Sequence, residues 1–491
     1  MTGAEIGDLI RRAAIRYGDD IALVDARRSL SFKQFDEATD KVGHGLLAAG
    51  LKPGDHVAVL LPQNSESVIA YYALAKAGLV RVALNPRETR ADHEYKIQDS
   101  GAVALLREAG EGPQAERVVT LDALRKMEQS AHGGPCRVAR ELDDLYRLAY
   151  TGGTTGKPKG VMLTTNIEIA EISNFLIDVL PDIRRGDTML HGAPVTHGSG
   201  GYLLPHLLRG ARNVILSKFD PESFVEALDR ERATATFLVP TMISMLLDQP
   251  SLARRKLALR RLVYGAAPIA PTVLQRGLDM LGPVFVQIYG QAEAPMCITC
   301  LQPEDHDRLG SAGRAYSLVG VRIGDEDGRE LPAGETGEVL ARGPCVMKGY
   351  WQRPQDSAEK FTADGWLRTG DMGYLDADGF LYLVDRKNDL IISGGFNVYP
   401  REVEDVLLAH PAIAEAAVVG LPDERWGDRV HAVIALRSAL SEAEVLAFCT
   451  ERLAGYKRPR GVSVFADLPK SPVGKILRRE ARRIVIEGTK S

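Results

Sequence analysis

A stretch of small, hydroxyl-bearing and basic residues, YTGGTTGKPKG, runs from Tyr150 to Gly160. Its flexible backbone could wrap N–H groups around phosphate oxygens, its threonine hydroxyls could donate hydrogen bonds, and its lysines could neutralise charge. A P-loop requires GxxxxGK followed by Ser or Thr, whereas Thr151 stands here at the first glycine position and Pro158 follows the lysine. The stretch therefore predicts a polyphosphate-binding loop of a different class.

A second spacing with chemical potential is the pair Cys297 and Cys300, within MCITCL. A zinc site would need a second such pair, and a thioredoxin-like redox motif would open a helix, while ITCL is strand-like. The chain has five cysteines, too scattered for a disulfide framework, which fits a reducing compartment. We expect the pair to serve packing.

The elements that must position the loop alternate between strand and helix. Ser31 and Gln34 form a capping box before a helical stretch, and VAVLLP from Val57 is typical of a buried strand. Ser65 can cap the next helix, and VRVALN from Val80 is again strand-like. This βαβ order predicts an α/β fold with parallel sheets in a large N-terminal domain.

The pattern changes after about residue 310, where short alternating runs are separated by turns such as DADGF. This predicts a β-rich subdomain. The charged stretch DRKND follows at 385–389, then a helix opened by Pro400 and another helix start, SEAE, at 441–444. We expect a small, mobile α+β C-terminal domain behind a polar hinge. The predicted divisions are 1–384, the large domain; 385–388, the hinge; and 389–491, the small domain.

Length and charge exclude some classes. The chain has 491 residues, which suggests several domains, and a net charge of -4, which argues against general nucleic-acid binding. Its first residues predict a short amphipathic helix rather than a signal peptide. No apolar run approaches the roughly 18 residues of a membrane span. We expect a cytoplasmic protein without an integral membrane segment; an oligomer is left open.

Further motifs follow the loop, in the order APVTHGSG (193–200), YGAAP (264–268), YGQAE (289–293), TGD (369–371), DRKNDLIISGG (385–395) and PKSPVGK (469–475). Together with YTGGTTGKPKG, this series resembles the adenylate-forming superfamily of acyl- and aryl-CoA synthetases, luciferases and peptide-synthetase adenylation domains. The resemblance covers nearly the whole chain.

The resemblance implies a two-step reaction. A carboxylate attacks the α-phosphorus of ATP and releases pyrophosphate, and the acyl-adenylate then passes its acyl group to the thiol of coenzyme A. Glu293 would supply an oxygen to Mg²⁺. The residues implied to hold the β- and γ-phosphates are Thr151, Gly152, Gly153, Thr154, Thr155, Gly156, Lys157 and Lys159.

Other implied nucleotide contacts come from three segments. Asp371 would accept both ribose hydroxyls, with help from Arg386, and Tyr289 is a candidate to stack on adenine beside Gly290 and Gln291. The small residues implied to line adenine are Gly265, Ala266, Ala267 and Pro268.

The resemblance gives Lys475 the central catalytic role of neutralising charge on the α-phosphate and carboxylate during adenylation. His197 matches the histidine that flanks the acyl pocket and pantetheine tunnel. The remaining pocket residues are Gly198, Ser199, Gly265 and Met296, and the implied CoA contacts are Gly394, Gly395, Trp426, Tyr456 and Arg458. Because both sets cannot face one site together, the small domain would rotate about Asn388.

Three positions depart from the family pattern: Gly152 replaces a common Ser, Asn388 replaces a hinge Asp or Lys, and Ala292 replaces a Thr. The missing threonine would remove a hydrogen bond to the α-phosphate, typically worth about 1.5–3 kcal/mol when one partner is charged. Gln291 or Thr154 could compensate.

The small pocket residues favour a fatty, alicyclic or aromatic acid over acetate. The alternatives are a stand-alone adenylation enzyme that loads a carrier protein, luciferase-like oxidation, and a non-catalytic nucleotide-binding regulator. The expected cofactors and co-substrates are ATP, Mg²⁺ and coenzyme A.

Overall fold

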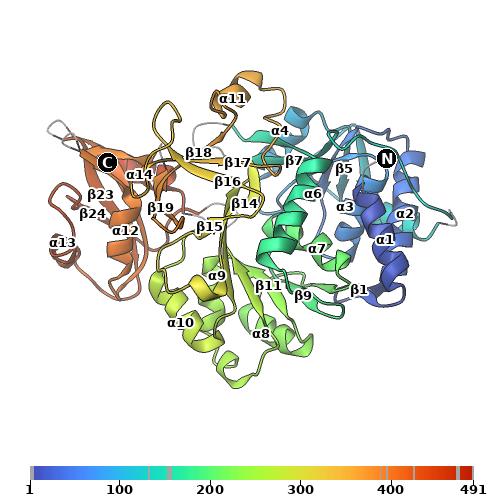
Figure 1. Cartoon of the computed structure of the whole chain (residues 1–491), viewed down its shortest axis with the longest axis horizontal. Coiled ribbons are helices and arrows are strands. Elements are labelled where there is room, and N and C mark those ends of the chain that lie inside the picture. Colours follow the sequence, from blue (N-terminus) through green and yellow to red (C-terminus); the bar gives the residue numbers. More distant parts are fainter. Residues whose placement is uncertain are drawn as a thin grey trace.

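The computed structural model describes residues 5–130, 133–151, 157–386, 389–393, 396–423, 426–470 and 476–488. The chain forms two sheets with covering helices in its N-terminal two-thirds, a β-rich sheet, and a separate C-terminal unit at the far end of the molecule (Figure 1). The predicted α/β class is confirmed.

A six-stranded sheet carries the predicted βαβ units, in the order β6-β5-β3-β4-β7-β8. Its strands are β3 (His56–Leu60), β4 (Val80–Ala83), β5 (Ala104–Arg107), β6 (Arg117–Thr120), β7 (Leu145–Thr151) and β8 (Lys159–Thr164). All run parallel except β8, which pairs antiparallel with β7 and sets Thr151 opposite Lys159. β7 and β8 thus form a hairpin that contains Thr151 and Lys159 of the predicted phosphate loop, and we call this pair of strands the phosphate hairpin.

A nine-stranded sheet follows the order β15-β14-β13-β12-β11-β9-β10-β1-β2. Its strands are β1 (Ile21–Val24), β2 (Ser29–Ser31), β9 (Thr188–His191), β10 (Arg212–Ile215), β11 (Ala235–Leu238), β12 (Arg261–Tyr264), β13 (Phe285–Gln291), β14 (Ala294–Leu301) and β15 (Arg314–Ala315). The inner strands from β1 to β13 are parallel, and β2, β14 and β15 are antiparallel. Cys297 and Cys300 are buried on β14, as the packing hypothesis predicts.

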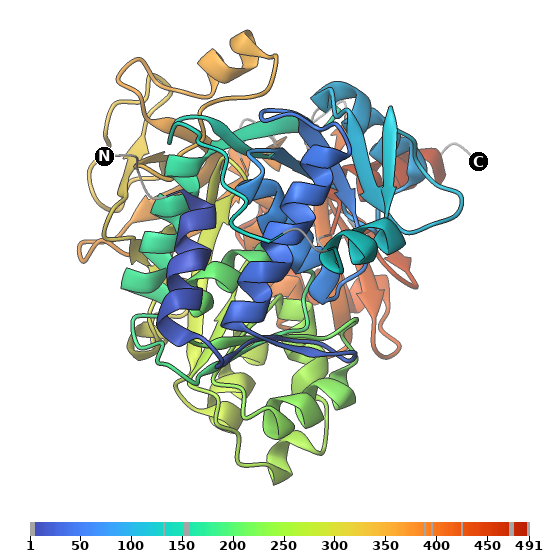
Figure 2. The same cartoon turned by 90° about the vertical axis from the view of Figure 1, so that its right-hand side faces the viewer.

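Helices cover both sheets. Successive strand residues face opposite sides of a sheet, so apolar residues on both faces need helices to bury them. The helices of this part are α1 (Ile6–Tyr17), α2 (Phe32–Ala48), α3 (Ser65–Lys76), α4 (Arg90–Ser100), α5 (Leu121–Glu128), α6 (Thr165–Asn174), α7 (Leu203–Leu208), α8 (Pro221–Arg230), α9 (Pro240–Leu247) and α10 (Pro271–Leu281). Leu190 and Leu262 pack towards α8–α10, while Met189 and Val263 pack in a cluster with Ala170 of α6 on the other face. Helices α1 and α2 lie side by side, and both pack against α3 (Figure 2).

Helix starts follow the sequence closely. The capping box of Ser31 and Gln34 is confirmed at α2. The cap predicted at Ser65 is wrong by one residue, because the side chain of Asn64 accepts the bond from Ser67 N at 3.0 Å and α3 already begins at Ser65. Asn and Ser are comparable caps, so local chemistry alone did not separate the two neighbours.

The β-rich region after residue 310 is confirmed as a four-stranded antiparallel sheet. Its elements are β16 (Gly320–Gly324), β17 (Gly337–Arg342), α11 (Pro354–Glu359), β18 (Leu367–Leu375) and β19 (Leu381–Arg386). The C-terminal unit has its own five-stranded sheet and core. Its elements are β20 (Ile391–Ser393), β21 (Phe396–Val398), α12 (Pro400–Leu408), β22 (Ile413–Asp423), β23 (Gly427–Leu436), α13 (Glu442–Thr450), β24 (Val462–Phe465) and α14 (Arg478–Gly488).

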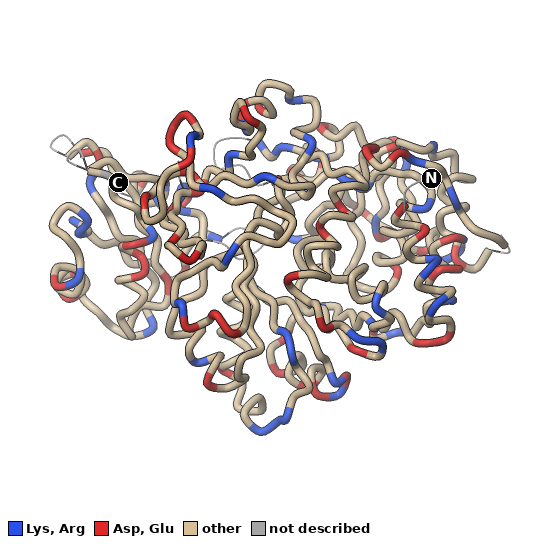
Figure 3. The backbone as a smooth tube through the Cα atoms, viewed as in Figure 1, with Lys and Arg blue, Asp and Glu red and all other residues tan. Residues whose placement is uncertain are grey.

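An ion cluster joins these two regions. Arg478 at the start of α14 contacts Asp385 at 2.6 Å, Asp389 at 2.9 Å and Glu404 at 2.7 Å. Asp385 belongs to β19, whereas Asp389 and Glu404 belong to the C-terminal unit, so the guanidinium of Arg478 bridges the junction. Acidic and basic residues are interspersed along the backbone (Figure 3).

Candidate active site

Three of the sequence motifs meet at the carboxyl ends of the parallel strands. The segment with His197 follows β9, Gly265 to Pro268 follow β12, and Tyr289 to Gln291 end β13. These strands are near neighbours in the nine-stranded sheet, so segments far apart in sequence meet at one edge. In open α/β sheets this edge is where ligands bind.

The glycines of these motifs permit close backbone approach. A Cβ at Gly265 would lie 2.4 Å from the carbonyl oxygen of Ile288, and one at Gly290 would lie 2.5 Å from Cα of Met296. Ala266 has φ of 67°, in the left-handed region that non-glycine residues seldom adopt. Ala266 and Pro268 are exposed at the strand end, where a flat base could reach them.

Asp371 lies on β18, opposite Arg386 on β19. Its Oδ2 accepts a hydrogen bond from the Tyr289 hydroxyl at 2.6 Å, and its Oδ1 lies 3.3 Å from Nε of Arg386. Burial, together with the Asp371 carboxylate, raises the pKa of Tyr289 well above its usual value, so the tyrosine stays a donor. The structure thus gives Tyr289 a partner that sequence reasoning missed; its stacking on adenine stays a prediction.

Glu293 lies between β13 and β14 and is buried. Its Oε1 accepts a hydrogen bond from the Tyr350 hydroxyl at 2.6 Å, while Oε2 has no hydrogen-bond partner among the described residues. The described chain holds no cluster of three or more His, Cys, Asp or Glu suited to a metal. Mg²⁺ needs none, because it binds one or two carboxylates together with substrate phosphates and water. Glu293 fits that role.

The two lysines of the phosphate hairpin already have partners. The ammonium of Lys157 lies 5.1 Å from the ring centre of Tyr95. The ammonium of Lys159 lies 5.3 Å from the ring centre of Tyr350 and 2.7 Å from Oδ1 of Asp356. Both side chains of the Lys159–Asp356 pair keep about a third of their surface exposed, so the pair is weak and can exchange for a phosphate. Residues Gly152, Gly153, Thr154, Thr155 and Gly156 lie outside the described residues.

His197 follows β9 and its side chain keeps exposed area. Desolvation by the protein packed around it lowers its pKa to about 4. Its Nδ1 lies 2.8 Å from the Thr196 hydroxyl. His197 is therefore neutral at pH 7 and can only exchange hydrogen bonds there.

The predicted acyl-pocket residues divide into two groups. A Cβ at Gly198 would meet the Phe237 ring at 3.0 Å and Sδ of Met296 at 3.3 Å, so these three lie together. Ser199 is fully buried, and its hydroxyl lies 2.8 Å from Nδ1 of His191. Its observed contact is thus with the fold, and its pocket role stays a prediction.

The predicted CoA residues lie on the C-terminal unit. Arg460 sits over the ring of Trp426 at 3.9 Å, Tyr456 stacks on Phe396 at 4.8 Å, and Nε of Arg458 donates to the Leu453 carbonyl. Sequence reasoning missed Arg460, an exposed arginine two residues beyond Arg458. Asn388, Gly394, Gly395 and Lys475 lie outside the described residues.

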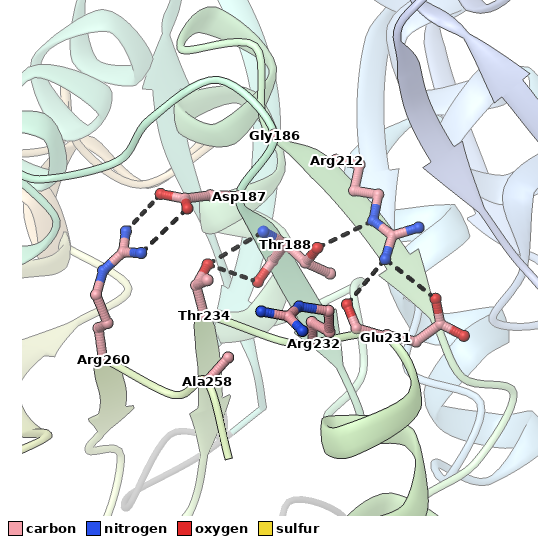
Figure 4. A pocket seen from close by; sticks show the side chains of 9 residues that line it. All are labelled: Gly186, Asp187, Thr188, Arg212, Glu231, Arg232, Thr234, Ala258 and Arg260. Carbon is pink, nitrogen blue, oxygen red and sulfur yellow. Dashed lines mark hydrogen bonds and ion pairs between the residues drawn. The ribbon is translucent and has the colours of Figure 1, made fainter. Parts of the chain in front are cut away.

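A cavity of about 390 Å³ lies elsewhere, at the amino ends of β9–β12 (Figure 4). Its acidic side chains are paired with arginines, since Asp187 binds Arg260 and Glu231 binds Arg212. No described residue of the sequence motifs lines this cavity. The cavity is therefore separate from the candidate active site.

Fold and site together define a nucleotide-binding enzyme with a two-part architecture. Residues 10–351 match the family of AMP-binding enzymes, and residues 402–475 match the AMP-binding enzyme C-terminal domain. The chain belongs to this family, which confirms the resemblance to adenylate-forming enzymes. No helix among the described residues combines the length and apolarity needed to cross a bilayer.

Curated relatives share 38% identity with this chain. One is a medium/long-chain fatty acid–CoA ligase of Mycobacterium tuberculosis, covering 96% of this chain and 87% of the relative. Another is a feruloyl-CoA synthase of Amycolatopsis, covering 93% and 94%.

Solved structures agree over nearly full length. ATP-bound MatB of Rhodopseudomonas palustris has a TM-score of 0.90 at 29% identity, covering 97% of this chain and 98% of that one. The o-succinylbenzoate–CoA synthetase of Bacillus subtilis with its acyl-adenylate has a TM-score of 0.88 at 33% identity, covering 96% and 97%.

Proposed function

We propose that this chain is an ATP-dependent carboxylic acid–CoA ligase. It converts an acid and ATP to acyl-AMP and pyrophosphate, then acyl-AMP and CoA to acyl-CoA and AMP. The observation that carries the proposal is the pair Asp371 and Glu293, two buried carboxylates at the carboxyl edge of the sheet, each held by a tyrosine hydroxyl. Relatives named as CoA ligases support it.

In the first half-reaction each carboxylate has a separate task. Asp371 is oriented by Tyr289 and Arg386, so its remaining lone pairs can accept the two ribose hydroxyls. Glu293 would present Oε2 to Mg²⁺, which supplies neutralising charge between the phosphates when bound. Lys475 would stabilise charge that develops on the α-phosphate and carboxylate oxygens. A neutral His197 would orient the acid without competing for protons.

The second half-reaction uses the C-terminal unit. Trp426 and Arg460 offer a flat ring and an exposed guanidinium, groups that suit an adenine ring and a phosphate. Tyr456 and Arg458 of the same unit would add to this surface. Rotation about Asn388, with 1–384 and 389–491 as the two bodies, would bring this surface to the site. The Arg478–Asp385 contact crosses that boundary and would have to adjust during rotation.

The acid is proposed to be fatty, alicyclic or aromatic. Phe237 and Met296 meet beside Gly198, which gives the pocket apolar walls and leaves volume where the glycine has no side chain. The curated relatives act on fatty acids, ferulate and 2-succinylbenzoate, which are all larger than acetate.

ATP–pyrophosphate exchange with a panel of acids tests this function. Exchange should be strongest with a bulky apolar acid; acetate as the best substrate would refute the pocket argument, and no exchange with any acid would favour a non-catalytic nucleotide-binding protein. Lys475→Ala should reduce adenylate formation about 100-fold, while thioester formation from a supplied adenylate continues. Equal loss of both half-reactions would contradict the two-pose scheme.

A second acceptor deserves direct comparison. A fatty acid–carrier-protein ligase of Streptomyces coeruleorubidus is 36% identical over 93% of this chain. CoA and a phosphopantetheinylated carrier protein should therefore be compared as acceptors in the same assay. Faster acyl transfer to the carrier protein would show that the carrier, rather than CoA, is the acceptor. The cytoplasmic location and the oligomeric state stay predictions.

A further inference from the structure

One short segment links the phosphate hairpin to Glu293. We call residues 347–351, between β17 and α11, the strap. It bonds to β8 on one side and to Glu293 on the other. Four backbone hydrogen bonds make these links: Met347 N to Glu293 O (2.8 Å), Lys348 N to Met162 O (3.1 Å), Met162 N to Gly349 O (2.9 Å) and Trp351 N to Gly160 O (2.8 Å). Since β8 is the second strand of the phosphate hairpin, the strap fixes the distance between that hairpin and Glu293.

Tyr350 repeats this link with its side chain. Its hydroxyl donates to Oε1 of Glu293 at 2.6 Å, and its ring lies beneath the ammonium of Lys159. Both Tyr350 and Glu293 are buried, at 5% and 6% exposure, so the bond is shielded from water. Lys159 is held from the other side by Asp356 of α11, just beyond the strap.

The chemistry of this bond suits a ligand-bearing carboxylate. A tyrosine hydroxyl is neutral, so it fixes Glu293 while leaving the full negative charge, and it occupies one oxygen only. An arginine or lysine in the same place would cancel the charge that a cation needs. Groups that orient a metal-binding carboxylate in this way typically change metal affinity 10–100-fold when removed.

We propose that Tyr350 is a positioning residue for the magnesium–pyrophosphate part of the site. It holds Glu293 so that Oε2 faces the metal, and it holds Lys159 beside the departing phosphates. The strap thereby couples the metal site to the phosphate hairpin. This inference rests on the proposed adenylation function and adds a residue 57 positions from Glu293 that no motif contains.

Tyr350→Phe tests the proposal because it removes the hydroxyl and keeps the ring. Mn²⁺ binding to the full-length enzyme with saturating ATP, followed by electron paramagnetic resonance, should weaken about tenfold. Binding of AMP in the presence of a chelator needs no metal and should stay within about twofold. The Mg²⁺ concentration for half-maximal pyrophosphate exchange should rise by a similar tenfold. Tyr374→Phe, on β18 and stacked against Tyr382, is the matched control and should change none of these.

A second variant separates the hydroxyl from the charge network. Asp356→Asn releases Lys159 and leaves Tyr350 and Glu293 untouched, so Mn²⁺ affinity should stay within about twofold of the unmodified protein. Equal weakening in both variants would overturn the role of the hydroxyl, and so would unchanged Mn²⁺ affinity in Tyr350→Phe. If the unmodified protein bound no Mn²⁺ with ATP, the proposed function itself would fail, which is a different outcome.

Discussion

The two edges of the nine-stranded sheet treat their carboxylates differently. At the amino edge, Asp187 is gripped by Arg260 and Glu231 by Arg212, so each charge is cancelled within the fold. At the carboxyl edge, Asp371 and Glu293 are buried to a similar degree as Asp187 but receive tyrosine hydroxyls instead. Only Asp371 also has a guanidinium nearby, at 3.3 Å.

This difference separates a stabilising edge from a binding edge. The charge of a buried carboxylate is neutralised when it pairs with an arginine, whereas a carboxylate held by a neutral hydroxyl keeps a charge that can attract a ligand. Under the proposed function, the amino-edge cavity is a structural feature despite its volume, and the carboxyl edge carries the chemistry.

The largest test of this comparison is Glu293→Gln. The amide keeps the size and the hydrogen bond from Tyr350 but removes the charge, so pyrophosphate exchange should fall about 100-fold or more. The melting temperature should not fall, because no buried cation loses its partner. A protein that keeps its exchange activity would show that the carboxyl edge does not need this charge.

Acid should destabilise the fold through the buried His191, the last residue of β9. Burial lowers the pKa of His191 to about 3, so below about pH 6.5 the unfolded chain takes up a proton that the folded chain does not. The free energy of unfolding should therefore fall by about 2 kcal/mol between pH 8 and pH 5 through this residue. Urea titrations at several pH values give the free energy of unfolding of the unmodified protein and of His191→Gln. This free energy should fall more steeply with decreasing pH in the unmodified protein, and an equal pH dependence in both would contradict the assignment.

Tyr289→Phe should weaken AMP binding about tenfold with or without metal, because Asp371 loses its orienting bond. Calorimetric titration with AMP measures this directly. The effect contrasts with Tyr350→Phe, which should act only when metal is present. The same metal dependence for both variants would contradict the separate roles proposed for Asp371 and Glu293.

Asp187→Asn should have the smallest effect on activity, within about twofold. It should instead lower the free energy of unfolding by about 1–2 kcal/mol, because Arg260 loses a charged partner in a partly buried site. Chemical denaturation and pyrophosphate exchange, measured on one preparation, distinguish a structural role of Asp187 from a catalytic one. A large activity loss without loss of stability would assign the amino edge a function.

Much of the fold could be predicted from local sequence. The βαβ order, the β-rich region after residue 310 and the capping box at Ser31 depend on residues close in the chain, where spacing and propensity decide. The family motifs mark Glu293 and Asp371 as well, because they combine residue type with order. The cap at Asn64 shows the limit, since two neighbouring polar residues were equally suitable.

The sequence by itself determined the class of fold, the family and the identity of the charged groups that could serve adenylation. Only the tertiary structure decided which partners those groups receive: Tyr350 for Glu293, Tyr289 for Asp371, Asp356 for Lys159 and Arg460 for Trp426. The physical reason is that side-chain partners across a sheet or between strands depend on register and packing between distant segments. No local pattern records that a tyrosine 57 residues away will meet a carboxylate.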